Sequence, residues 1–140
     1  MLLAQLEQAE PITRRRRALW ERYHSAFAGI EEGGLARRPV VPAETEHNGH
    51  IYYLLLPDET VRDRFISEMA SRGIATPFHF IPLHDSPGGR RFSRAAGDLP
   101  VTHWAARRLV RLPLWPGLED RQDAVIDAVH AALDKAAKNR

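Results

Sequence analysis

Apolar side chains recur at nearly the helical period over the first thirty residues of the chain. They occupy positions 2, 3, 6, 12, 19, 20, 23, 27 and 30, and the pattern stops at Gly33 and Gly34. This spacing predicts one or two amphipathic helices in a leading region, residues 1–34. Pro11 disfavours helical geometry at the residue before it, so we expect a kink or a short break at Glu10.

A strand, a helix and a second strand are predicted next. The run HIYYLLL, residues 50–56, is rich in aromatic and aliphatic side chains and is typical of a buried strand. Asp58 can cap a helix that continues to about Arg72. The sequence GIAT, residues 73–76, predicts a short second strand. If the two strands are parallel neighbours, the helix between them forms a right-handed crossover.

The segment 77–100 is interrupted by four prolines and three glycines and is predicted to be irregular, with one or two helical turns around 90–96. Thr102 can cap a helix that continues to about Val110. The sequence RLPLW, residues 111–115, is typical of a short edge strand, because proline cannot donate to a sheet ladder. Pro116 and Gly117 predict a turn.

The last segment places five apolar side chains on one stripe and predicts an amphipathic helix: Val125, Ile126, Val129, Ala132 and Leu133. Together these elements predict an α/β (α+β) fold in which a small mixed or antiparallel sheet is layered with amphipathic helices. The length of 140 residues and the absence of a linker or an internal repeat indicate a single domain, 1–140.

Composition narrows the classes of function. The chain has no cysteine, which excludes disulfides and thiolate chemistry and suits a reducing compartment, so we expect a cytoplasmic protein. No apolar run approaches the length of a membrane span, so we expect no membrane insertion. The run Arg14 to Arg17 suggests nucleic-acid binding, yet four consecutive residues spread around a helix. A solvated face is favoured, and we expect no nucleic-acid partner.

Four of the seven histidines form two pairs in predicted loops, His47 with His50 and His79 with His84. A metal site is conceivable, since imidazole binds zinc and Asp85 offers an oxygen. The spacing is not diagnostic, because a proline separates His79 from His84 and no HExxH motif occurs, so we predict no metal ligands. The remaining histidines, 24, 103 and 130, are predicted to be ordinary helical residues. Neither a Gly-x-Ser-x-Gly elbow nor a phosphate-binding glycine motif is present.

Four sequence blocks in fixed order are specific for a known family. They are HNGHIYYLLL, RDRFISEMASRGI, ATPFHFIPLHDSP and GDLPVTHWAARRLVRLPLWPGL. Over nearly its whole length the chain resembles the carboxy-terminal small domain of the DegT-type sugar-nucleotide aminotransferases, which are fold type I enzymes dependent on pyridoxal phosphate. Within the family it is most similar to the transaminases that act on dTDP-4-keto-6-deoxyglucose in enterobacterial common antigen and lipopolysaccharide biosynthesis.

The resemblance implies that the small domain closes over an active site whose cofactor is held mainly by a preceding large domain. It implies an amino group taken from a donor, most plausibly L-glutamate, a nucleotide-sugar substrate and a homodimeric full-length enzyme. The segment 77–100 would face the active site. Substrate-binding positions on the sugar-facing side of the cleft would be Asn48, His50, His79 and His84.

Two departures from the family pattern affect the expected activity. Family members commonly have tyrosine where this chain has Phe80. A pyridoxal enzyme also needs a buried lysine for its internal aldimine. The only lysines are Lys135 and Lys138, near the end of the chain. We therefore expect no catalytic or cofactor-binding residue and no activity in the chain alone.

Two other interpretations remain open. The chain could be a stand-alone, non-catalytic module that binds a sugar nucleotide or serves in assembly. It could also be a small histidine metalloprotein, which would retain stoichiometric metal after purification without an affinity tag. An exposed apolar face would favour the missing large domain over the stand-alone module, because such patches mark interfaces.

Overall fold

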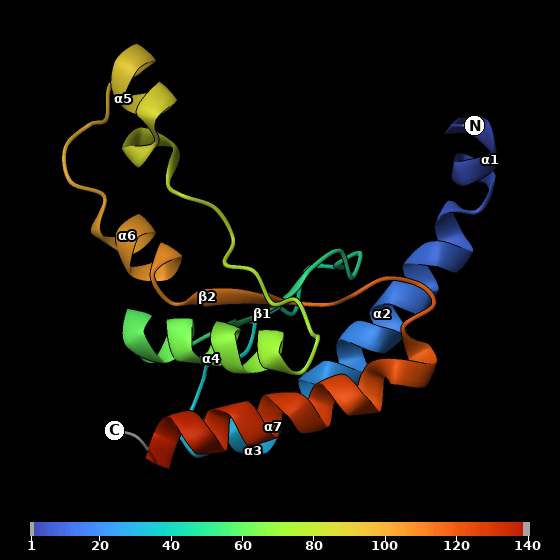
Figure 1. Ribbon diagram of the computed structural model, residues 1–140. Helices are drawn as coiled ribbons and strands as arrows, with labels where there is room; N and C mark the ends of the chain where they lie inside the picture. Colours follow the sequence, from blue (N-terminus) through green and yellow to red (C-terminus); the bar gives the residue numbers. More distant parts are fainter. Residues whose placement is uncertain (1, 139–140) are drawn as a thin grey trace.

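The computed structural model describes residues 2–138. Three helices lie on one side of a short strand pair, and an extended segment rises on the other side (Figure 1). We call the helices and strands beneath the extended segment the base. We call residues 77–106 the arm. No helix in the described part of the chain is long and apolar enough to cross a membrane.

The leading region forms α1 (Leu2–Glu7), α2 (Ala9–Ala26) and α3 (Ala28–Glu32), as the apolar spacing predicts. The first interruption falls at Gln8 rather than at Glu10. Pro11 lies inside the first turn of α2, where a missing N–H removes no helical hydrogen bond. The proline therefore shifts the break toward the chain start without interrupting α2.

The sheet is a single antiparallel pair, β1 (Tyr52–Leu55) and β2 (Leu109–Leu112), with Tyr52 opposite Leu112. A single bridge adds one residue at each outer edge of the strand pair. Arg37 pairs with Leu55 of β1, and Phe78 pairs with Val110 of β2. The predicted α/β (α+β) fold class is thus confirmed, and of the two predicted sheet types, mixed or antiparallel, the sheet is antiparallel.

Two strand predictions are wrong. Residues 73–76 form no strand, and the segment joins β2 only at Phe78, so the parallel crossover does not exist. The strand expected at 111–115 begins two residues earlier and ends before Pro113, whose nitrogen cannot donate to the ladder. This shift also means that the helix expected to reach Val110 ends sooner, because Val110 belongs to β2.

The helices α4 (Glu59–Ser71) and α7 (Gln122–Lys138) pack on each other and on the strand pair (Figure 1). The carboxylate of Asp58 accepts a hydrogen bond from the Val61 amide at 2.8 Å, which confirms the predicted cap. Gly73 follows α4 with a φ of +74°, the left-handed conformation that favours glycine. The turn at Pro116 and Gly117 is also confirmed, and a 3-10 turn, η2 (Glu119–Arg121), leads into α7.

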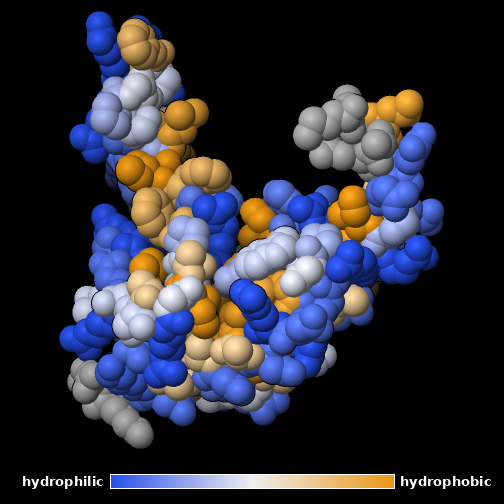
Figure 2. Space-filling model, turned by 45° about the vertical axis from the view of Figure 1, so that its right-hand side comes forward, coloured by the Kyte–Doolittle hydropathy of each residue, from blue (hydrophilic) through white to orange (hydrophobic). Residues whose placement is uncertain are grey.

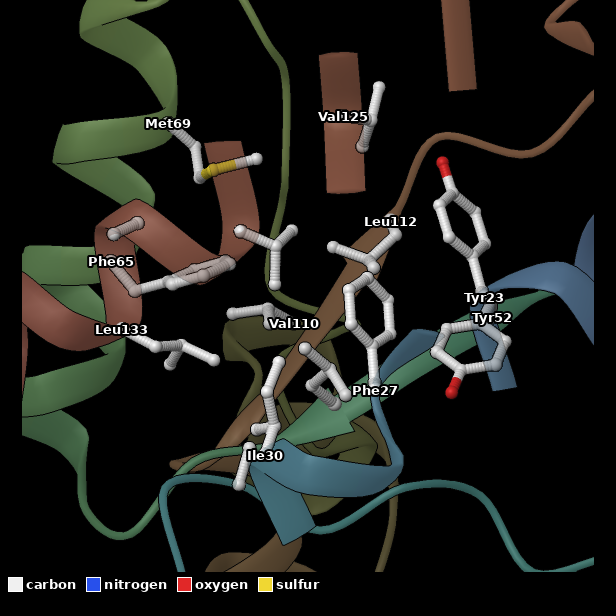
Figure 3. Packing of buried hydrophobic residues seen from close by; sticks show 14 of the residues in the cluster. Tyr23, Phe27, Ile30, Tyr52, Phe65, Met69, Val110, Leu112, Val125 and Leu133 are labelled. Carbon is white, nitrogen blue, oxygen red and sulfur yellow. The ribbon is translucent and has the colours of Figure 1, made fainter. Parts of the chain in front are cut away.

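The core lies between these helices and the strands, and Figure 3 shows part of it. Tyr23, Phe65 and Met69 are fully buried there. The Tyr23 hydroxyl donates to the Pro113 carbonyl at 2.9 Å, and the buried amide of Gln122 donates to the Leu19 carbonyl at 2.6 Å. These two bonds fasten α2 to the strand end and to α7.

The arm contains three short helical pieces, η1 (Leu83–Asp85), α5 (Pro87–Phe92) and α6 (Pro100–Ala106). The helical turns predicted at 90–96 lie earlier, because Ser86 caps α5 by accepting the Gly89 amide at 2.9 Å. Thr102 is not a cap, since α6 already begins at Pro100. The irregular character predicted for 77–100 is otherwise present.

Candidate functional site

The candidate residues divide into two groups by their place along the chain. Asn48 and His50 lie in the loop before β1, whereas His79 and His84 lie on the arm. His50 lines one open cleft, and chain neighbours of His79 and His84 line a second one, which shares no lining residue with the first. No single cleft is therefore lined by all four side chains.

The loop before β1 is held by its own polar side chains. The Asn48 side-chain oxygen accepts the His50 amide at 3.0 Å, and Nδ1 of His47 accepts the Gly49 amide at 3.1 Å. Gly49 has a φ of +62°, and a Cβ there would lie 2.8 Å from the Arg16 backbone. Only glycine allows this close approach to α2. The loop conformation consequently leaves the side chains of Asn48 and His50 exposed.

His50 borders a cleft of about 340 Å³ between the strand ends and the start of the arm. Arg16, Pro77 and Arg111 line the same cleft. The cleft thus combines two guanidinium groups and an imidazole, which can donate hydrogen bonds to an anionic or hydroxyl-rich ligand. Sequence reasoning missed Arg16 and Arg111, because an arginine in a helix or a strand carries no local motif.

His79 lies where the arm leaves β2, next to Arg111. Burial first, and the positive charge of Arg111 second, lower the pKa of its imidazole below the ordinary value of 6.5. The ring is therefore neutral at neutral pH. Its buried Nδ1 has no hydrogen-bond partner among the described residues. A neutral imidazole with an unpaired nitrogen can donate to or accept from a ligand.

Phe80 follows His79 and packs edge-on against its ring, with 4.5 Å between ring centroids. The guanidinium of Arg111 lies 5.4 Å from the centre of the Phe80 ring. Phe80 itself is 65% exposed. The position where the family commonly has tyrosine thus presents an exposed aromatic ring without a hydroxyl.

His84 belongs to a separate cluster with Asp85 and His103. Its Nε2 lies 3.2 Å from Nε2 of His103, and Nδ1 of His103 lies 3.1 Å from Oδ2 of Asp85. All three side chains are partly buried. Asp85 and His103 border a cleft of about 260 Å³ that Glu59 and Phe80 also line. Sequence reasoning treated His103 as an ordinary helical residue, because its partners lie 18 and 19 positions earlier across an irregular segment.

Tyr52 of β1 points into the core and is fully buried against Trp20 and Tyr23. Tyr53, on the other face of β1, is partly exposed. Neither contributes to the two clefts. His24 and His130 are partly buried helical residues that pack on Trp20 and Phe27, as predicted for ordinary positions.

The arm carries a concentration of exposed apolar side chains, and Figure 2 shows hydrophobic groups along it at the left of that view. They include Phe78, Phe80, Ile81, Leu83, Phe92 and Val101. A free surface with this many large apolar groups on one segment is typical of an interface.

Comparison with known proteins gives a consistent assignment. Residues 1–130 match the model of the DegT/DnrJ/EryC1/StrS aminotransferase family. A dTDP-3-amino-3,4,6-trideoxy-alpha-D-glucose transaminase from Micromonospora megalomicea subsp. nigra is 32% identical over 84% of this chain and 32% of its own length.

Two of the solved structures that align with the chain illustrate the match. DesV from S. venezuelae, in complex with a ketimine intermediate, is 31% identical with a TM-score of 0.81, over 94% of this chain and 34% of that one. A Streptococcus pneumoniae protein in its PMP form is 25% identical with a TM-score of 0.83, over 96% of this chain and 34% of that one. The chain therefore spans about a third of the length of these relatives.

Proposed function

Because the chain belongs to the DegT/DnrJ/EryC1/StrS aminotransferase family and is a portion of a sugar aminotransferase, we propose that it is the carboxy-terminal small domain of a longer enzyme. In this proposal the enzyme transfers an amino group from L-glutamate to a nucleotide-linked 4-keto-6-deoxy sugar. The product serves lipopolysaccharide or related glycan synthesis in the cytoplasm. The support is the family match together with coverage of only about a third of each relative.

Pyridoxal phosphate supplies the electron sink for amino transfer in this family, but the residues described here do not fit its Schiff base. Lys135 has a side chain that is 64% exposed and that donates to Glu68 at 2.6 Å. A lysine that forms an internal aldimine needs a buried pocket. The proposed division of labour is therefore that a preceding large domain holds the cofactor and that this chain alone is inactive.

The proposed contribution of this chain is to contact the sugar. The main support is His79, because its imidazole is neutral and partly exposed beside an exposed segment of the arm. A neutral imidazole can accept a hydrogen bond from a sugar hydroxyl or donate one to it. Asn48 and His50 are proposed to contact the sugar nucleotide from the loop before β1, and His84 to line the same side from the arm.

The apolar arm supports the proposed partners. A domain whose whole surface faces solvent rarely exposes several large apolar side chains on one segment. We assign this surface to the large domain of the same enzyme and to the second subunit of a homodimer. The stand-alone module, by contrast, requires that this apolar surface stay in water.

The intact mass of the native gene product, measured from cells of the source organism, tests the proposal directly. We expect a mass well above the 15.9 kDa of this chain, with a lysine-bearing portion before it. A native product of 15.9 kDa that binds a nucleotide sugar saturably would instead support the stand-alone module.

An activity assay on the native-length product tests the role of His79. With pyridoxal phosphate, L-glutamate and dTDP-4-keto-6-deoxyglucose, we expect an aminated sugar by mass spectrometry. His79→Ala should lower kcat/KM about two- to tenfold, the range for one lost hydrogen bond. His130→Ala, on α7 and remote from both clefts, is the control and should leave kcat/KM unchanged. Equal effects of the two variants contradict the role of His79.

A further inference from the structure

The cluster of His84, Asp85 and His103 has the composition and spacing of a metal site. One ligand atom from each residue can be chosen so that all three lie within 4.8 Å of one another. It is the one such group of three found among the described residues. The pair considered from the sequence, His79 with His84, is not brought together, because the structure pairs His84 with a histidine from α6 instead.

The distances fit a tetrahedral ion. Zinc binds imidazole nitrogen at about 2.0–2.1 Å, so two nitrogens on one tetrahedron lie about 3.3 Å apart. The Nε2 atoms of His84 and His103 are 3.2 Å apart. Oδ2 of Asp85 lies 3.1 Å from Nδ1 of His103, the nitrogen that does not face His84. Two imidazole nitrogens at this spacing can share one zinc ion, with a carboxylate supporting one of the rings.

The local structure positions these three groups. The 3-10 turn Leu83–Asp85 carries His84 and Asp85 on consecutive residues, and Ser86 closes that turn by donating to the Leu83 carbonyl at 2.7 Å. The Arg90 guanidinium lies 3.3 Å from Oδ1 of Asp85, which leaves Oδ2 toward the imidazoles. Oδ2 also lies 3.1 Å from Nδ1 of His103. A carboxylate on one ring nitrogen leaves the other nitrogen free to bind metal.

We propose that His84 and His103, supported by Asp85, bind a divalent transition-metal ion of the zinc class. The ligands are Nε2 of His84 and Nε2 of His103, and Asp85 holds the His103 ring in place from its Nδ1 side. The remaining coordination positions face the cleft of about 260 Å³ and are filled by water or by a ligand oxygen. The ion links two parts of the arm, because the ligands come from η1 and from α6.

The probe is Zn²⁺ alone, titrated calorimetrically into the untagged 140-residue chain, with Co²⁺ absorption as a second readout of coordination. We expect one equivalent of ion. His84→Ala and His103→Ala should each weaken binding at least about tenfold, and Asp85→Asn should weaken it by about ten- to a hundredfold. His79→Ala is the matched control, since it removes a histidine from the same arm but outside the cluster.

Absence of saturable Zn²⁺ binding by the unmodified chain overturns the proposal. So does an affinity that His84→Ala and His103→Ala leave unchanged while circular dichroism shows folded protein. The test needs neither cofactor nor sugar, so its failure leaves the proposed function intact.

Discussion

The base and the arm differ in what holds them in place. In the base, side chains such as Tyr23, Phe65 and Val129 are fully buried, and α2, α4 and α7 pack around them. In the arm, Gly89 is the only buried residue between Ser86 and Val101. Short-range hydrogen bonds such as those of Ser86 hold its turns. The base therefore derives its stability from apolar burial, whereas the arm depends on a few hydrogen bonds and ion pairs.

The candidate site follows the same difference. A packed base fixes the strand pair from which the arm rises, and the cleft that His50 lines opens beside that pair. The candidate ligand-binding side chains lie in loops and short turns rather than in the core, as is common for binding residues. The residues that specify the fold are therefore separate from the candidate site residues.

The largest expected effect comes from truncating equivalent aromatic side chains in the two regions. Phe65→Ala removes a ring with 0% exposure from the core and should lower the free energy of unfolding by about 3–5 kcal/mol. Phe92→Ala removes a ring with 79% exposure from the arm and should change it by less than about 0.5 kcal/mol. Urea denaturation followed by circular dichroism measures both, and similar losses would remove the distinction between base and arm.

A smaller effect is expected from removing the helix cap in each region. Asp58→Ala deletes the cap of α4 and should lower the free energy of global unfolding by about 1 kcal/mol. Ser86→Ala deletes the cap of α5, but that helix can open without unfolding the base. We therefore expect unchanged urea stability and faster amide hydrogen exchange over residues 87–93. Loss of global stability in Ser86→Ala would show that the arm unfolds together with the base.

The smallest expected effect concerns one exposed ion pair of the base. Glu119 accepts from Nε of Arg15 at 2.7 Å, and this bond, with the Gly117 amide, lowers the pKa of the Glu119 carboxyl from 4.5 to about 2. A lowered carboxyl pKa adds stability above about pH 4.5, and that stability is lost as pH falls toward 2. Glu119→Gln should therefore reduce the drop in urea midpoint between about pH 7 and about pH 3.

The control for that titration is Asp98→Asn, an exposed carboxyl on the arm. Because Asp98 lies outside the base, the change in urea midpoint between the two pH values should stay as in the unmodified chain. A larger acid-induced drop in Glu119→Gln than in the unmodified chain contradicts the expected sign.

The sequence predicts the base well where signals are local. The cap at Asp58, the stop at Gly73 and the apolar stripe of α7 each lie within a few residues of the element that they define. The strands are less predictable, because their pairing depends on residues far apart in the chain. Residues 73–76 have strand-like composition, but the partner of β1 is Leu109–Leu112, so no strand forms there.

The candidate site is predictable only in part. The polar loops and their histidines are visible in the sequence, whereas the contacts between them depend on how the arm folds. His103 meets His84 through α6, and Arg111 meets His79 through a bridge between Phe78 and β2. Neither pairing has a sequence motif, since each joins residues separated by an irregular segment.

The attachment of the arm has a consequence for the evolution of the sequence. Both ends of the arm are fastened to one place, because the Arg111 amide donates to the Pro77 carbonyl at 2.9 Å and Phe78 pairs with Val110. A segment whose ends already meet can be lengthened, shortened or exchanged as a cassette without moving the helices beneath it. Selection can thus alter the ligand-facing surface while the inherited scaffold is left intact.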